Sequence, residues 1–359
     1  MRVNGKAVVG IVLSLLLLWW TLRDVSLAHI VHELRNADPF LFLLAVTVAT
    51  LGLVTRAIRW RILLLPVTRD LPFRPRFAAT AIGFAANNLL PARVGEFARA
   101  FSLSRFSRVS TAAAFGSLVI ERVLDALVIV ALLFGVMVLP GFPPIAQIGG
   151  VDLRAAAVFV VAAIGGLSLV LFFLVAAPVR AASAIEWVAV RTLPPSIRRT
   201  VVDALHAFLH GLAALRSPRL LLLSLGWAVG QWLFLGLSFL LAFRAFDIRE
   251  VGFAGALFLQ SLIGLAVAIP SSPGFFGPFE AAAKVGLSLW GVAPEKAVSF
   301  AVGFHIGGFI PVTLIGVYYV WKMDLRWQDV GRSEEVVEER VERDQAALAM
   351  PVRERTRHD

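Results

Sequence analysis

The sequence predicts an all-α polytopic membrane protein, and three observations support this fold class. Apolar residues make up 58% of the 359-residue chain and charged residues 16%, with a mean hydropathy of +0.81. These values differ strongly from those of an average soluble domain. The apolar residues form long runs between short polar loops, and arginines concentrate in particular loops. We expect about six full spans plus two oppositely oriented re-entrant helical hairpins.

The net charge of +10 and the absence of cysteine exclude several functional classes. Arginines in a membrane protein mostly mark cytoplasmic loops and anionic headgroups. They are spread among the spans here, so no nucleic-acid partner is expected. Without cysteine the chain forms no disulfide and performs no thiol catalysis. Nucleotide-binding loops, nucleophile elbows and zinc motifs are missing from the sequence, so we expect no cofactor, no metal and no enzymatic activity.

The first two spans are predicted over residues 7–22 and about 40–58. Trp19 and Trp20 end the first run where a signal peptide would have a small-residue cleavage site, which favours a retained span. The second span ends in a group of arginines that is typical of a cytoplasmic loop. That group comprises Arg56, Arg59, Arg61, Arg69, Arg74 and Arg76.

The next apolar run, residues 77–90, is too short to cross a bilayer. At ~1.5 Å per residue it reaches ~21 Å, against a hydrocarbon core of ~30 Å. It carries Asn87 and Asn88 and breaks at Pro91, after which a polar helix extends to about Arg108. This pattern predicts the first re-entrant hairpin.

A span over residues 111–138 places three charged side chains near the bilayer centre. Glu121 and Asp125 are four residues apart and share one helix face, with Arg122 on the adjacent face. An isolated ion in hydrocarbon costs ~2.5 kcal/mol or more, so these groups need partners. Arg93 and the Glu96–Arg99 pair are candidates. The cluster would be either a buried structural ion-pair network or part of a substrate or proton pathway.

Three further spans are predicted over residues 155–177, 220–243 and 296–321, and residues 178–218 form a basic connection. The segment 252–291 is broken near its middle by three prolines and two glycines. Backbone N–H groups at this break are candidates for binding a phosphate oxygen. The residues concerned are Ser271, Ser272 and Gly274. Glu280 follows at a helix start, where a carboxylate complements the helix dipole or lines the polar path.

With six crossings, every arginine-rich loop and both termini lie in the cytoplasm. The two hairpins then enter from opposite sides, as in an inverted repeat. A count of eight crossings remains an alternative. We expect residues 1–325 to form the transmembrane domain and residues 326–359 a charged, mobile cytoplasmic tail.

Four motifs in order resemble the lysylphosphatidylglycerol synthase transmembrane family, which is flippase-like and also called UPF0104. The motifs are Arg56-Ala57-Ile58-Arg59-Trp60, Asn87 to Glu96 with Arg99, Glu121 to Asp125, and Pro270 to Gly274 with Gly277 and Glu280. The resemblance implies movement of lipids or lipid-linked molecules between leaflets. It also implies fusion to a synthase or glycosyltransferase in some members, for which this chain has no room. Phe275-Phe276 stands where the family often has Gly-Gly, which makes an aminoacyl-lipid substrate doubtful.

The sequence thus favours a translocator of a phospholipid or a prenyl- or terpenoid-linked lipid in the cell membrane. The headgroup would pass through a polar groove between the hairpins. An intramembrane lipid-modifying transferase with Glu121 and Asp125 as the base, or a non-transporting partner of a lipid-modifying enzyme, are the alternatives. The candidate substrate-binding residues are Asn87, Asn88, Arg93, Glu96, Arg99, Glu121, Arg122, Asp125, Ser271, Ser272, Gly274 and Glu280.

Overall fold

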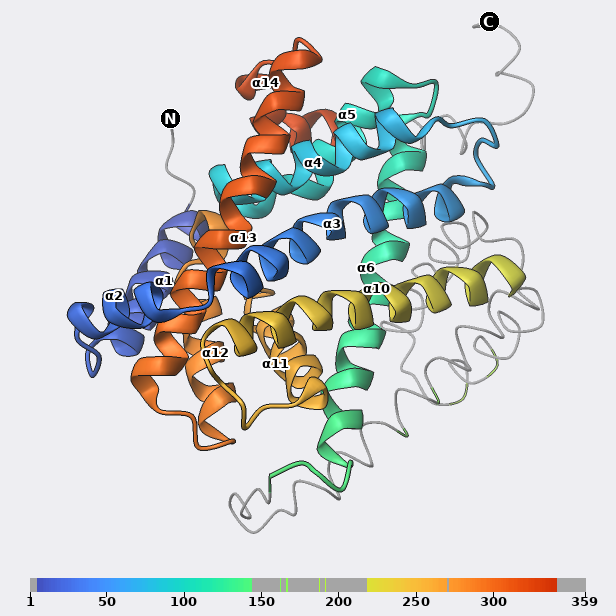
Figure 1. Ribbon diagram of the computed structural model, residues 1–359. Coiled ribbons are helices and arrows are strands. Elements are labelled where there is room, and N and C mark those ends of the chain that lie inside the picture. The colour runs from blue at the N-terminus through green and yellow to red at the C-terminus, as the bar shows by residue number, and fades with distance from the viewer. Residues whose placement is uncertain are drawn as a thin grey trace, which may run out of the picture.

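The protein is a bundle of helices that cross one another at varied angles (Figure 1). The computed structural model describes residues 5–143, 218–269 and 271–340, with four isolated positions at 162, 166, 187 and 191. These ranges contain helices and no strand, which confirms the all-α prediction for them. The elements are α1 (Gly5–Leu22), α2 (Leu27–Asn36), α3 (Pro39–Leu64), α4 (Phe73–Leu89), η1 (Pro91–Arg93), α5 (Gly95–Phe106), α6 (Thr111–Met137), α10 (Pro218–Ala245), α11 (Phe253–Ala266), η3 (Pro273–Phe275), α12 (Pro278–Ser288), α13 (Pro294–Lys322) and α14 (Trp327–Gly331).

Local chemistry explains where several helices begin. The Asp38 carboxylate caps α3 by accepting the N–H groups of Phe40 and Leu41, and Pro39 occupies the first helical position. The Ser110 hydroxyl accepts the N–H of Ala113 at the start of α6. α1 and α2 meet at a bend of 77°.

Both segments predicted to be broken form helix–break–helix hairpins. The halves of the first hairpin, α4 and α5, pack against each other, and so do α11 and α12 of the second. α4 and α11 reach only ~25 and ~21 Å at ~1.5 Å per residue. The two breaks also touch, because η1 contacts η3. The helix breaks are therefore confirmed, and they meet inside the bundle.

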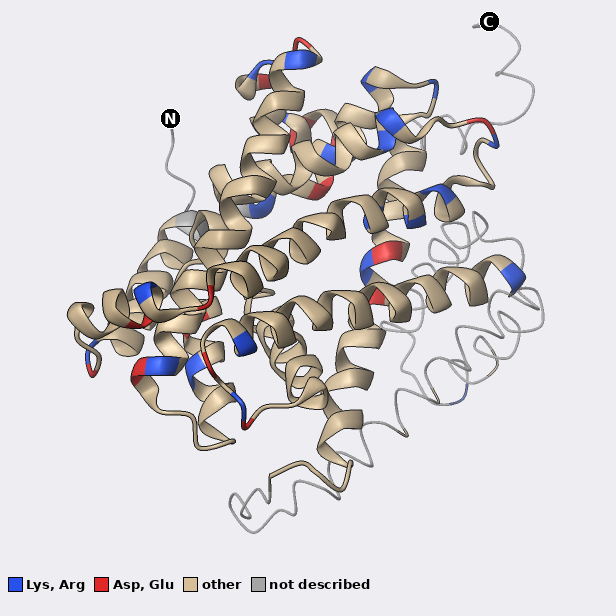
Figure 2. Cartoon of the chain, viewed as in Figure 1, with Lys and Arg blue, Asp and Glu red and all other residues tan. Residues whose placement is uncertain are grey.

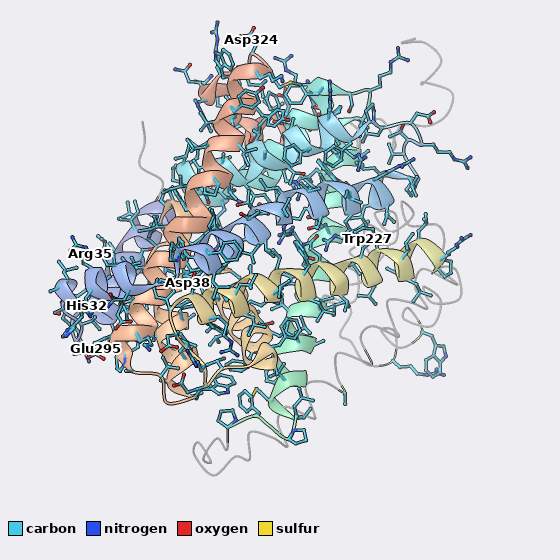
Figure 3. The ribbon with its side chains drawn as sticks, viewed as in Figure 1. His32, Arg35, Asp38, Trp227, Glu295 and Asp324 are labelled. Carbon is cyan, nitrogen blue, oxygen red and sulfur yellow. The ribbon has the colours of Figure 1, made fainter. Side chains whose placement is uncertain are left out.

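The two flanks of each hairpin belong to one hydrophobic cluster, and the two hairpins join different clusters. Leu71 and Val109, which flank the first hairpin, belong to one hydrophobic cluster with Leu325. Val251 and Val292, which flank the second, belong to a different cluster. Leu325, just after α13, packs against the first of these clusters, and Ala297, near the start of α13, belongs to the second. Glu295 and Asp324, which mark these two ends of α13, lie far apart in Figure 3.

Charged residues collect at helix ends, with one group in the interior on α6 (Figure 2). Three helices, α3, α10 and α13, are long and apolar enough to cross a membrane, and α1 with α2 supplies a fourth if the bent pair is one span. α6 has 27 residues but carries three charged side chains along its length. The predicted span 155–177 and connection 178–218 fall almost wholly outside the described residues.

The chain after α13 folds back onto the bundle. Residues 333–340 continue the helical structure after α14. Val330 and Val337 are fully buried, and Arg340 Nη1 donates to Thr111 Oγ1 at 3.0 Å. At least the first part of the segment expected to be a mobile tail therefore has fixed packing. Residues 341–359 lie beyond the described ranges.

Close packing of α4 against α13 depends on Gly316. A Cβ there would overlap the Ala85 methyl group and the Ala81 carbonyl, and the latter is backbone that cannot move aside. We expect Gly316→Ala to lower the free energy of unfolding by about 1–3 kcal/mol. Gly116→Ala on α6, where nothing lies within 4 Å, is the matched control and should be neutral or stabilising. Thermal unfolding in detergent tests this, and equal melting temperatures would contradict it.

Candidate functional site

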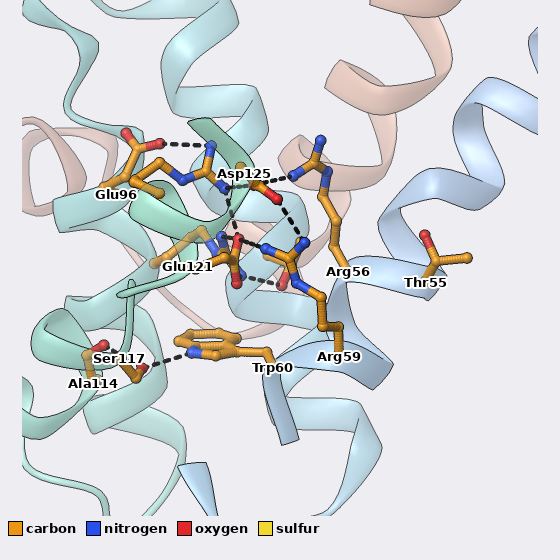
Figure 4. Close-up of polar contacts among 12 residues, drawn as sticks. Thr55, Arg56, Arg59, Trp60, Glu96, Ala114, Ser117, Glu121 and Asp125 are labelled. Carbon is orange, nitrogen blue, oxygen red and sulfur yellow. Dashed lines mark hydrogen bonds and ion pairs between the residues drawn. The ribbon is translucent and has the colours of Figure 1, made fainter. Parts of the chain in front are cut away.

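Seven charged side chains form one cluster inside the bundle, where α3, α5 and α6 meet (Figure 4). We call this the charged cluster, and its members are Arg56, Arg59, Glu96, Arg99, Glu121, Arg122 and Asp125. The spacing of the α6 residues places Glu121 and Asp125 on the face toward α3. Arg59, Arg99 and Glu121 are at most 2% exposed.

Asp125 is held by groups from α3, α6 and α10. Arg59 Nη1 donates to Oδ1 at 2.6 Å, and Trp232 Nε1 donates to the same oxygen at 3.3 Å. Arg122 Nη2 and Arg56 Nη1 lie 3.2 and 3.5 Å from Oδ2. One carboxylate thus ties three helices together.

Glu121 lies among three guanidinium groups. Its Oε1 is 2.6 Å from Arg122 Nη2, 2.8 Å from Arg99 Nη1 and 3.7 Å from Arg59 Nη2. Arg99 also lies over the ring of the fully buried Trp60, 4.4 Å from the ring centre. Because an uncompensated buried ion is strongly destabilising, these contacts are needed to keep the charges inside the bundle.

The charged cluster carries more positive than negative charge. Four guanidinium groups face three carboxylates among the described residues, which leaves one positive charge. Several buried guanidinium nitrogens also have no hydrogen-bond acceptor there. They include Arg56 Nη1, Arg59 Nε, Arg99 Nε and Arg122 Nε. Buried donors are nearly always satisfied, so this arrangement suits an anion or water.

Arg93 joins the two helix breaks. Its Nη1 donates to the Ala268 carbonyl at 2.7 Å, and its guanidinium lies 5.1 Å from the centre of the Phe275 ring. Both Arg93 and Phe275 have left-handed backbone, with φ of 57° and 63°. Strained backbone of this kind gathers at functional sites. Nε and Nη2 of Arg93 are buried without an acceptor in the described part of the chain.

The second break packs against α1. The Ser272 N–H donates to Ser14 Oγ at 2.8 Å, and Gly277 lies against the Ser14 backbone. Gly10 also lies against the Ser271 backbone, though less closely. The Ser272 amide, predicted to be free for a phosphate, therefore already has a partner.

Glu280 lies apart from the arginines. Its Oε2 accepts the Gly277 N–H at 2.7 Å, which caps α12, and its Oε1 lies 2.6 Å from His305 Nδ1. The His305 ring stacks on Phe279, with ring centres 4.1 Å apart, and also contacts Phe276. The helix-start role of Glu280 agrees with the structure, whereas no arginine contacts it among the described residues.

A cavity of about 280 Å³ lies beside the breaks. Asn88 near the inner end of α4, Gly264 near that of α11 and Phe279 at the start of α12 line it, together with residues of α3, α10 and α13. Trp232 connects it to the charged cluster, since its ring lines the cavity and its Nε1 donates to Asp125. The cavity, the breaks and the cluster are thus contiguous.

The predicted site residues separate into groups. Glu96, Arg99, Glu121, Arg122 and Asp125 come together, whereas Arg93 lies at the junction of the breaks. Asn87 caps α5 by accepting the Gly95 N–H, and Asn88 donates to Thr313 and lines the cavity. Ser271 Oγ is buried without a described partner, and Gly274 is buried with φ of 72°. Substrate binding by any of these residues stays a prediction.

Sequence reasoning missed several residues of the site. Arg56 and Arg59 were expected at a cytoplasmic helix end, but α3 continues to Leu64 and buries both, together with Trp60. A basic and aromatic helix end resembles a membrane interface, so the pattern was ambiguous. Gln260 and His305 had no distinguishing local signal.

The chain is similar in sequence to several known proteins. A UPF0104 membrane protein of Methanothermobacter thermautotrophicus is 28% identical over 87% of this chain and 94% of its own length. The glycosyltransferase AglD of Haloferax volcanii is 27% identical over 83% of this chain, which spans 51% of that relative. A UPF0104 membrane protein of Methanocaldococcus jannaschii is 27% identical over 38% of the chain and 42% of its own length.

The family model described as the lysylphosphatidylglycerol synthase TM region matches residues 7–316. That range contains the charged cluster, both helix breaks and the cavity. The predicted family is thereby confirmed. With the long apolar helices α3, α10 and α13, the match establishes that this chain is a multi-pass membrane protein and belongs to the lysylphosphatidylglycerol synthase TM region family.

Proposed function

We propose that this protein moves a lipid or a lipid-linked molecule between membrane leaflets without changing it chemically. The observation that carries the proposal is the meeting of two helix breaks, through Arg93, beside a cavity and a buried cationic cluster. Broken helices inside a bilayer are tolerated where they line a cavity, and buried ionisable groups there commonly mark a transport pathway. The headgroup would cross at this junction while its tails remain in lipid.

The proposed topology has six full spans and two re-entrant hairpins that enter from opposite faces. The flanks of each hairpin share one hydrophobic cluster, and the two clusters reach opposite ends of α13, which supports this arrangement. The end containing Arg61, Arg69 and Arg74 would face the cytoplasm, with both termini. Arg93, which has two buried donors without an acceptor, and Arg56, whose Nη1 has only an ion pair with Asp125 at 3.5 Å, would hold the lipid phosphate in turn.

Fluorescent-lipid flipping in proteoliposomes tests this function. We expect lipids to equilibrate between leaflets faster with the protein than in protein-free vesicles, for at least one anionic lipid class. Rates equal to those of empty vesicles across several lipid classes, for protein shown to be folded, would overturn the proposal. Conversion of a labelled lipid to a new product would instead favour a transferase. The relative AglD is named a glycosyltransferase, but this chain matches only about half of its length, so that activity is not carried over to this chain.

A further inference from the structure

The residues that line the cavity beside the breaks indicate which kind of lipid headgroup it would bind. Six aromatic side chains line it: Phe84, Trp232, Phe239, Phe279, Phe304 and Phe309. Among the described lining residues none is arginine, lysine, aspartate or glutamate. Its polar groups come from Asn88, Ser238, Gln260 and His305. Such a site, mostly apolar with a few polar groups, is typical of small-molecule pockets.

Gln260 presents a hydrogen-bond acceptor. Its Nε2 donates to the Trp232 carbonyl at 2.7 Å, and because a carbonyl only accepts, the amide nitrogen must be on that side. Oε1 is then fixed on the other side. This atom is buried without a partner in the described structure, and the whole residue is 3% exposed. An unsatisfied buried acceptor of this kind calls for a ligand donor or water.

Asn88 presents a second acceptor by the same reasoning. The Thr313 hydroxyl donates to the Phe309 carbonyl at 2.7 Å, so it can only accept from Asn88. Asn88 Nδ2 donates to it at 2.8 Å, which orients the amide. Asn88 Oδ1 therefore faces away from Thr313, and no hydrogen bond to it occurs within the described ranges.

His305 contributes an imidazole ring to the cavity wall. Its Nδ1 lies 2.6 Å from Glu280 Oε1, and the ring packs against Phe276 and Phe279. Gln260 and Asn88, which line the same cavity, thus each carry an acceptor that no donor in the described structure satisfies.

We propose that the cavity binds an uncharged headgroup bearing hydroxyl groups, such as a glycerol or sugar unit of a lipid. Its hydroxyls would donate to Gln260 Oε1 and Asn88 Oδ1. An ammonium group fits less well, because both oxygens of the neighbouring Glu280 carboxylate are already used by His305 and Gly277. The volume of about 280 Å³ is at the lower edge of the ~300–1,000 Å³ typical of ligand pockets, which suits a headgroup rather than a whole lipid. This inference rests on the proposed function.

Binding of short-chain lipids to the purified protein tests the proposal. The detergent should lack hydroxyls, for example dodecyldimethylamine oxide. The probes are dihexanoylphosphatidylglycerol, dihexanoylphosphatidylmethanol, which has the same charge but no hydroxyl, and dihexanoylphosphatidylethanolamine, which has an ammonium. We expect the glycerol lipid to bind about tenfold more tightly than the methyl lipid, as one to two new hydrogen bonds predict. Free glycerol 3-phosphate, as a fourth probe, separates a lipid site from a soluble-metabolite site.

Substitutions of lining residues test whether the preference for the glycerol lipid arises in the cavity. Gln260→Met and Asn88→Leu should each bring the two phosphodiester lipids to within about twofold of one another. Gln231→Met is the matched control, since Gln231 is a buried amide on α10 that does not line this cavity, and it should keep the preference. Melting temperatures confirm that each variant is folded.

Equal binding of the glycerol and methyl lipids by the wild-type protein would overturn the inference. Tightest binding of the ethanolamine lipid, or binding of free glycerol 3-phosphate as tight as that of the lipid, would overturn it as well. Flipping measured on the same preparation keeps the two proposals apart. If the protein flips lipids but does not prefer the glycerol lipid, the proposed function stands and the binding site does not. If it prefers the glycerol lipid but flips no lipid, the binding site stands and the proposed function does not.

Discussion

Glu121→Gln should destabilise the protein strongly, because Glu121 is the fully buried carboxylate that faces three guanidinium groups. The substitution preserves shape and removes one negative charge from a cluster that already has an excess of positive charge. Removing one partner of a buried ion pair costs about 3–5 kcal/mol, since the remaining charge is left without compensation. We expect a lower melting temperature in detergent and a lower yield of folded protein.

Glu96→Gln provides the matched control. It removes the same charge from the same cluster, but Glu96 is partly exposed and lies 3.8 Å from the half-exposed Arg122. Exposed ion pairs contribute about 1 kcal/mol or less. Equal melting temperatures for the two variants would show that the charged cluster does not hold the fold through Glu121. The comparison also distinguishes a structural ion-pair network from a substrate pathway. If the charged cluster is purely structural, the flipping rate per folded protein should be the same in both variants.

Arg93→Gln should slow lipid flipping about ten- to hundredfold while leaving the protein folded. Arg93 joins the breaks through Ala268 and Phe275 and retains two buried N–H donors for an anion. A hydrogen bond to a charged group contributes about 1.5–3 kcal/mol, and each 1.4 kcal/mol is a factor of ten. The measurement is the initial flipping rate of an anionic lipid per folded protein.

Arg105→Gln is the control for this change. Arg105 lies on the same hairpin and also packs over an aromatic ring, 5.7 Å from the centre of Phe101, but it is exposed at the outer end of α5. It should leave the flipping rate within about twofold of the wild type. If Arg93→Gln flips lipids as fast as Arg105→Gln, the junction of the breaks is not on the lipid pathway.

The helices and their breaks were predictable because their signals are local. Pro91 and the run from Pro270 to Pro278 cannot continue a helix, and the observed breaks fall there. The charged residues on one face of α6 could also be predicted from the sequence. Which side chains contact one another could not be predicted, because the partners are far apart in the chain. Arg59 and Asp125 are separated by 66 residues, and Glu280 and His305 by 25. These pairings depend on how whole helices cross, which residue spacing does not encode.

The contact between α1 and the second break implies an order of assembly. The Ser272 N–H and its acceptor, the Ser14 hydroxyl, are separated by 258 residues. Contacts at such sequence separation form late, because a long loop must close first. During synthesis the Ser14 hydroxyl therefore has no access to this donor until the second hairpin has been made. A chain that began after residue 14 would leave the Ser272 amide without this partner.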